Sequence, residues 1–84
     1  MSGGTRLLLP PAARALAGGA AVVYVAAGNV RQLVAELDSR FPGLGQRVER
    51  EMALVIDGEI WQNAYDVPIP AGAEVTLIPR LKGG

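Results

Sequence analysis

The 84-residue chain contains no cysteine and no histidine. The absence of cysteine excludes a disulfide scaffold and fits a reducing compartment. Without these two residue types the chain lacks the commonest general base, the soft metal ligands and the strongest side-chain nucleophile of proteins. If the protein takes part in a reaction, the reacting group is expected to be something other than a side chain.

The sequence also has no excess of charge of one sign and no long apolar run. Eight basic and eight acidic residues give a formal net charge of zero, whereas nucleic-acid-binding domains carry a clustered basic excess. The two apolar stretches that could be mistaken for a targeting or membrane segment are residues 7–9 and 18–28, and both are shorter than the roughly 20 residues that a transmembrane helix needs. We therefore expect no nucleic-acid partner, no membrane partner and a cytoplasmic location.

Acidic residues gather around one segment, but they do not predict a metal site. Four carboxylates lie in and around the predicted hairpin at Asp57-Gly58: Glu49, Glu51, Asp57 and Glu59. Such a group is usually a solvated face, because exposed turns are rich in charge. No metal ligand is assigned.

Half of the residues are hydrophobic and 19% are charged, which is typical of one globular domain. The clearest element is a helix over residues 30–41. Its apolar residues recur at helical spacing and form one stripe: Val30, Leu33, Val34, Leu37 and Phe41. Asn29 and Gln32 predict a capped start for this helix, and Pro42-Gly43 predicts its end.

The remaining apolar segments predict strands at 5–9, 20–26, 53–56, 59–61 and 74–79. Asp57-Gly58 is a type I′ hairpin signal between the third and fourth strands. We expect a brief helical turn at 12–17 and an irregular segment at 44–51. This order predicts an α+β fold in two layers, with a mixed sheet of four or five strands packed on one main helix.

The chain ends in Gly83-Gly84, after a segment in which strand pairing should fade at Pro79. Glycine has no Cβ, so a diglycine end can adopt any backbone conformation and thread a narrow slot. We therefore expect a folded domain over residues 1–79 and a flexible C-terminal diglycine tail over residues 80–84. The carboxylate of Gly84 is the best candidate for the reacting group.

Several short motifs occur in a characteristic order. They are residues 13–19 (ARALAGG), residues 41–43 (FPG), residues 55–58 (VIDG), residues 71–79 (AGAEVTLIP) and the terminal Gly83-Gly84. In this order and at this spacing the sequence resembles the bacterial ubiquitin-like sulfur-carrier proteins. That group includes the small subunit of molybdopterin synthase and the sulfur carrier of thiamine biosynthesis. The resemblance spans nearly the whole chain and implies a ubiquitin-like β-grasp fold.

The resemblance implies a protein substrate rather than an enzyme, although it could be counted as the small subunit of a synthase. An E1-like adenylating enzyme would use ATP to form an acyl-adenylate at Gly84. A sulfur donor would then convert it to a thiocarboxylate, and a sulfur-accepting synthase subunit would take the sulfur for a cofactor or an amino acid. No cofactor would be bound by the chain itself. The tail residues Arg80, Leu81, Lys82 and Gly83 would thread into the partner.

Alternatives stay open at this point. The tail over residues 80–84 carries two basic side chains and also resembles the tail of ubiquitin. This resemblance suggests a second possible function, a protein modifier that is conjugated through Gly84 to target lysines. A third interpretation is an interaction domain whose diglycine is incidental. Trp61 and Tyr65 are either core-rim residues or partner-docking residues. Arg14 either forms a structural ion pair or docks a partner.

Overall fold

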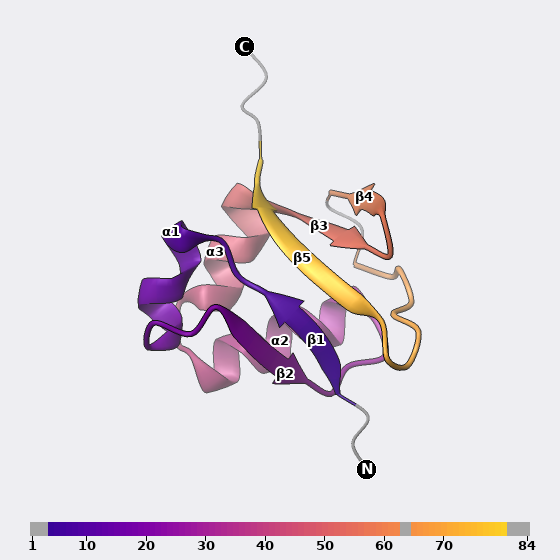
Figure 1. Ribbon diagram of the computed structural model, residues 1–84, viewed down its shortest axis with the longest axis horizontal. Coiled ribbons are helices and arrows are strands. Elements are labelled where there is room, and N and C mark those ends of the chain that lie inside the picture. Colours follow the sequence, from indigo (N-terminus) through magenta and orange to yellow (C-terminus); the bar gives the residue numbers. More distant parts are fainter. Residues whose placement is uncertain (1–3, 63–64, 81–84) are drawn as a thin grey trace.

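The computed structural model describes residues 4–62 and 65–80. A five-stranded sheet forms one layer, and two helices cover one of its faces (Figure 1). The elements in chain order are β1 (Thr5–Leu8), α1 (Pro11–Arg14), η1 (Ala15–Ala17), β2 (Val22–Val25), α2 (Val30–Arg40), α3 (Leu44–Glu51), β3 (Met52–Ile56), β4 (Glu59–Trp61) and β5 (Glu74–Pro79). The predicted α+β class is confirmed. None of the helices in this described part is long and apolar enough to cross a membrane.

The sheet is mixed, and its strand order is β2-β1-β5-β3-β4. Strand β1 pairs with β5 in parallel, whereas the other three pairs are antiparallel. At the hairpin between β3 and β4, Asp57 and Gly58 have φ values of 48° and 93°, as a type I′ turn requires. Because β5 lies in the middle of the sheet, the described chain ends beside both α3 and β3 (Figure 1).

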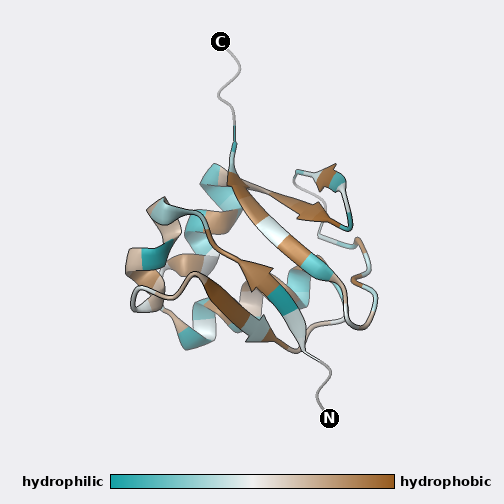
Figure 2. Cartoon of the chain, in the orientation of Figure 1, coloured by the Kyte–Doolittle hydropathy of each residue, from teal (hydrophilic) through white to brown (hydrophobic). Residues whose placement is uncertain are grey.

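The predicted apolar stripe faces the sheet. Val30, Leu33, Val34 and Leu37 are buried on α2 and belong to one core with the inward residues of β1 and β5. Hydropathy alternates along β5 (Figure 2). The apolar residues Val75 and Leu77 of this strand are buried in the core that α2 covers. The helix ends at Arg40, one residue earlier than predicted, and Phe41 is its half-buried C-cap.

The start of α2 is capped by its own side chains. Asn29 Oδ1 accepts a hydrogen bond from the Gln32 amide at 2.8 Å, and Gln32 Oε1 accepts one from the Gly28 amide at 2.8 Å. The predicted cap is therefore confirmed, with the Gln32 side chain reaching one residue beyond the N-cap.

The prediction of an irregular segment at 44–51 is wrong, because these residues form α3. Leu44 and Val48 are buried on one face of this helix. Its N-cap, Gly43, adopts a left-handed conformation and supplies no capping side chain. Instead, Asp38 Oδ1, on α2, accepts hydrogen bonds from the amides of Gly43 at 3.1 Å and Gly45 at 3.2 Å. Two of the amide donors at the start of α3 are thus satisfied by a side chain of a neighbouring helix.

Gly45 lets α3 approach α2 closely. A Cβ at this position would lie 2.6 Å from Asp38 Cβ and 2.7 Å from the Val34 carbonyl oxygen. We expect Gly45→Ala to lower the free energy of unfolding by about 1–3 kcal/mol, because overpacking outweighs the gain in helix propensity. Gln46→Ala, at an exposed position of the same helix, is the control and should change stability by less than about 0.5 kcal/mol. Urea unfolding measures both, and a Gly45→Ala protein as stable as wild type would contradict the close contact.

Candidate functional site

Arg80 follows β5 directly and holds the end of that strand against α3. Its backbone amide donates a hydrogen bond to the Glu51 carbonyl at 2.8 Å. Its Nη2 donates to the carbonyls of Glu49 at 3.0 Å and Met52 at 3.1 Å. The prediction that residue 80 hangs free in a tail is therefore wrong. Pairing does not fade at Pro79, because the next residue supplies the backbone donor that proline lacks.

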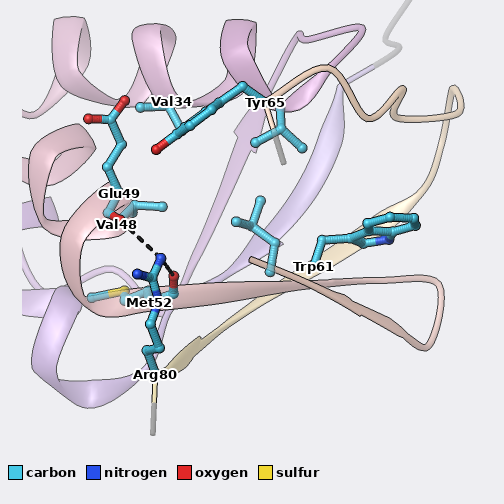
Figure 3. Close-up of a pocket in the computed structure, with 9 residues that line it drawn as sticks. Val34, Val48, Glu49, Met52, Trp61, Tyr65 and Arg80 are labelled. Carbon is cyan, nitrogen blue, oxygen red and sulfur yellow. Dashed lines mark hydrogen bonds between the residues drawn. The ribbon is translucent and has the colours of Figure 1, made fainter. Parts of the chain in front are cut away.

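A small hollow adjoins this contact. Figure 3 shows Arg80 entering it from one side and the Tyr65 ring from the other, with Trp61 at its edge. Its apolar lining includes Val34, Val48 and Leu54. The free space is about 10 Å³, whereas small-molecule pockets measure about 300–1,000 Å³. The hollow can hold one water molecule and is too small for a cofactor.

Tyr65 is held in place by the start of α2. Its carbonyl accepts a hydrogen bond from the Arg31 amide at 2.9 Å, and the Arg31 guanidinium lies 5.9 Å from the centre of its ring. Arg31 also pairs with the exposed Asp66 at 3.1 Å. Tyr65 and Trp61 are both half-buried and pack against the core. They are core-rim residues, and their role in docking a partner stays a prediction.

Arg14 lies elsewhere. It is on α1, on the β1–β2 side of the sheet, whereas Trp61 is on β4 at the opposite edge (Figure 1). Its Nε donates a hydrogen bond to the Leu9 carbonyl at 2.9 Å. Within residues 4–62 and 65–80 Arg14 makes no ion pair, and its hydrogen bond goes to a backbone carbonyl instead. Its role in docking a partner is untested.

The four carboxylates that lie close together in the sequence are divided between α3 and the β3–β4 hairpin. Glu49 and Glu51 are on α3, whereas Asp57 and Glu59 belong to the β3–β4 hairpin. In the described part of the chain, no group of three or more acidic side chains is arranged to hold a metal ion.

Of the predicted site residues, the structure brings Arg80, Trp61 and Tyr65 together around one hollow and leaves Arg14 apart. Leu81, Lys82, Gly83 and Gly84 lie outside the described residues. Sequence reasoning missed the carbonyls at the α3–β3 junction that bind Arg80. The signal available was the pair Leu44 and Val48, spaced i, i+4 ahead of a strand.

Comparison with protein-family models identifies the family of this chain. A model described as the ThiS family matches residues 7–84. The chain belongs to the ThiS family. ThiS-family proteins are ubiquitin-like sulfur carriers, so the resemblance seen in the sequence is confirmed. No curated protein sequence matches the chain.

Solved structures have the same β-grasp fold as this ThiS-family chain. CysO of Mycobacterium tuberculosis, described as an antigen, is 17% identical with a TM-score of 0.82, covering 92% of this chain and 99% of that one. A structure of the BexX/CysO complex of Amycolatopsis orientalis matches at 19% identity and a TM-score of 0.81, covering 95% and 99%. SAMP1 of Haloferax volcanii matches at 24% identity and a TM-score of 0.75, covering 98% and 100%. At these identities the matches show the fold alone.

Proposed function

We propose that this protein carries sulfur as a thiocarboxylate on Gly84. The observation that supports it most is the ThiS-family match, which runs from residue 7 to residue 84 and so includes Gly83-Gly84. The absence of cysteine and histidine agrees with it, because a carrier of this kind reacts through its own carboxylate and needs no side-chain nucleophile. The protein acts as a substrate of other enzymes.

The chemistry proceeds in two steps. The Gly84 carboxylate attacks the α-phosphorus of ATP, and pyrophosphate leaves, so that an acyl-adenylate forms. A donor that supplies sulfur at the oxidation level of sulfide then attacks the acyl carbon and expels AMP. The product is a thiocarboxylate, whose sulfur a third protein consumes. A carboxylate needs this activation because its own oxygen is a poor leaving group.

Three partners follow from these steps: an E1-like adenylating enzyme, a sulfur donor and a sulfur-accepting synthase subunit. The crystallised BexX/CysO complex supports the expectation that a domain with this fold assembles with another protein. The first step consumes ATP, which agrees with a cytoplasmic location. The sulfur would enter molybdopterin, thiamine or an amino acid.

A second candidate function is a protein modifier joined through Gly84 to target lysines. The basic residues Arg80 and Lys82, close to the diglycine, favour it because they resemble the tail of ubiquitin. Both functions begin with adenylation of Gly84. They differ in the nucleophile that then attacks the acyl group, which is sulfide for the carrier and a lysine amine for the modifier.

Intact mass spectrometry of the protein isolated from its native host tests the proposal. We expect a species heavier than the unmodified chain by the mass difference between sulfur and oxygen, and we expect alkylation of the thiocarboxylate to shift that species alone. A Gly84-deleted protein expressed in the same host is the control and should lack it. Conjugates with other proteins and no sulfur-containing species would instead support the modifier.

A further inference from the structure

The contact between Arg80 and α3 has a consequence for delivery of the C-terminus. We propose that Arg80 is a positioning residue, which fixes the point where the C-terminal segment leaves the domain, so that a partner receives only residues 81–84. This inference rests on the proposed function, because it concerns how Gly84 reaches an adenylating enzyme. It removes Arg80 from the segment that threads into the partner.

The backbone of Arg80 prolongs the sheet. In the antiparallel pair of β3 and β5, Met52 lies opposite Pro79. The hydrogen bond from the Arg80 amide to the Glu51 carbonyl continues this register by one residue. Pro79 has no amide donor, so Arg80 is the residue that holds the end of β5 in place.

The side chain of Arg80 also binds the segment where α3 ends and β3 begins. The last four carbonyls of an α-helix lack intrahelical partners, and a cation is favourable near them. Arg80 Nη2 reaches two carbonyls at the α3–β3 junction, those of Glu49 and Met52 (Figure 3). These acceptors belong to the backbone, so the fold itself sets their positions. Amide and guanidinium together attach one residue to α3 and to β3.

A fixed exit point limits where the carboxylate can go. Four extended residues span at most about 14 Å, compared with about 17 Å for five. With its base held at Arg80, the carboxylate would be presented to the partner from a defined point, which would raise the chance that Gly84 meets ATP in a productive geometry. A partner that binds the Arg80 guanidinium directly would first have to break the hydrogen bonds from that guanidinium to the carbonyls of Glu49 and Met52.

The test compares Arg80→Ala with wild type in ATP–pyrophosphate exchange catalysed by the cognate adenylating enzyme. We expect kcat to fall about tenfold, because productive alignment becomes rarer. The carrier concentration giving half-maximal rate should stay within about twofold, because residues other than Arg80 dock the domain. Arg80→Lys should give an intermediate kcat, since one ammonium group cannot reproduce the planar fork of the guanidinium. Arg50→Ala removes an exposed arginine from α3 and should leave both constants unchanged.

Two other results would overturn the inference. If the half-maximal concentration rises in Arg80→Ala and Arg80→Lys restores it, the partner binds the Arg80 charge directly. If only the melting temperature falls, and kcat and the half-maximal concentration match wild type, Arg80 is a structural residue alone. Failure of wild type and Arg50→Ala to support exchange would contradict the proposed function itself, and so is distinguishable from both.

Discussion

Deletion of Gly84 is expected to abolish ATP–pyrophosphate exchange with the cognate adenylating enzyme, while the fold stays unchanged. The Gly84 carboxylate is the proposed acceptor of the adenylyl group from ATP, and removing the residue moves the new carboxylate back by one position, to Gly83. Adding one residue after Gly84 should be equally harmful, because the carboxylate then lies one residue too far along. The buried core of the described residues runs from Leu7 to Leu77, so we expect the circular dichroism of both variants to match that of wild type.

Two substitutions sharpen this experiment. Gly83→Val should be nearly as harmful as the deletion, because a β-branched side chain stiffens and widens a segment that has to enter a narrow slot. Trp61→Ala, at the core rim, should weaken docking at most and leave measurable exchange. Equal exchange from the intact and the Gly84-deleted proteins would show that the C-terminus is not the reacting group.

Leu37→Ala is expected to lower the free energy of unfolding by about 2–5 kcal/mol, because it leaves a cavity in the middle of the core. Leu37 is 0% exposed, and the buried core of this domain lies between α2 and the sheet. In a domain of this size the loss is a large part of the total stability of about 5–15 kcal/mol. Urea unfolding at constant m-value measures it.

Glu36→Ala is the matched control for Leu37→Ala, since Glu36 is exposed on the same helix. It should change stability by less than about 0.5 kcal/mol. A Leu37→Ala effect as small as that of the control would contradict the placement of the stripe against the sheet. Folded Leu37→Ala protein should still support ATP–pyrophosphate exchange, because Leu37 takes no part in the proposed chemistry at Gly84.

Local patterns in the sequence were sufficient for most of the fold. The period of the apolar residues between Val30 and Phe41 determines which face of α2 is buried, because that period depends only on helix geometry. Asp57-Gly58 determines the hairpin, because two consecutive positive φ values suit those residue types. The motifs that resemble sulfur carriers led to the ThiS family, which the family match confirms. Gly84 as reacting group is a prediction that comes from sequence alone.

Only the tertiary structure decided how α3 begins and where Arg80 lies. Helix α3 begins at a glycine without a capping side chain, and its first amides bind Asp38 on another helix. The side-chain acceptors of Arg80 lie 31 and 28 residues back along the chain, at Glu49 and Met52. Both features depend on hydrogen bonds between segments that are distant in sequence. Short-range periodicity and turn chemistry carry no information about such pairs, because the partners meet only after the helices have packed on the sheet.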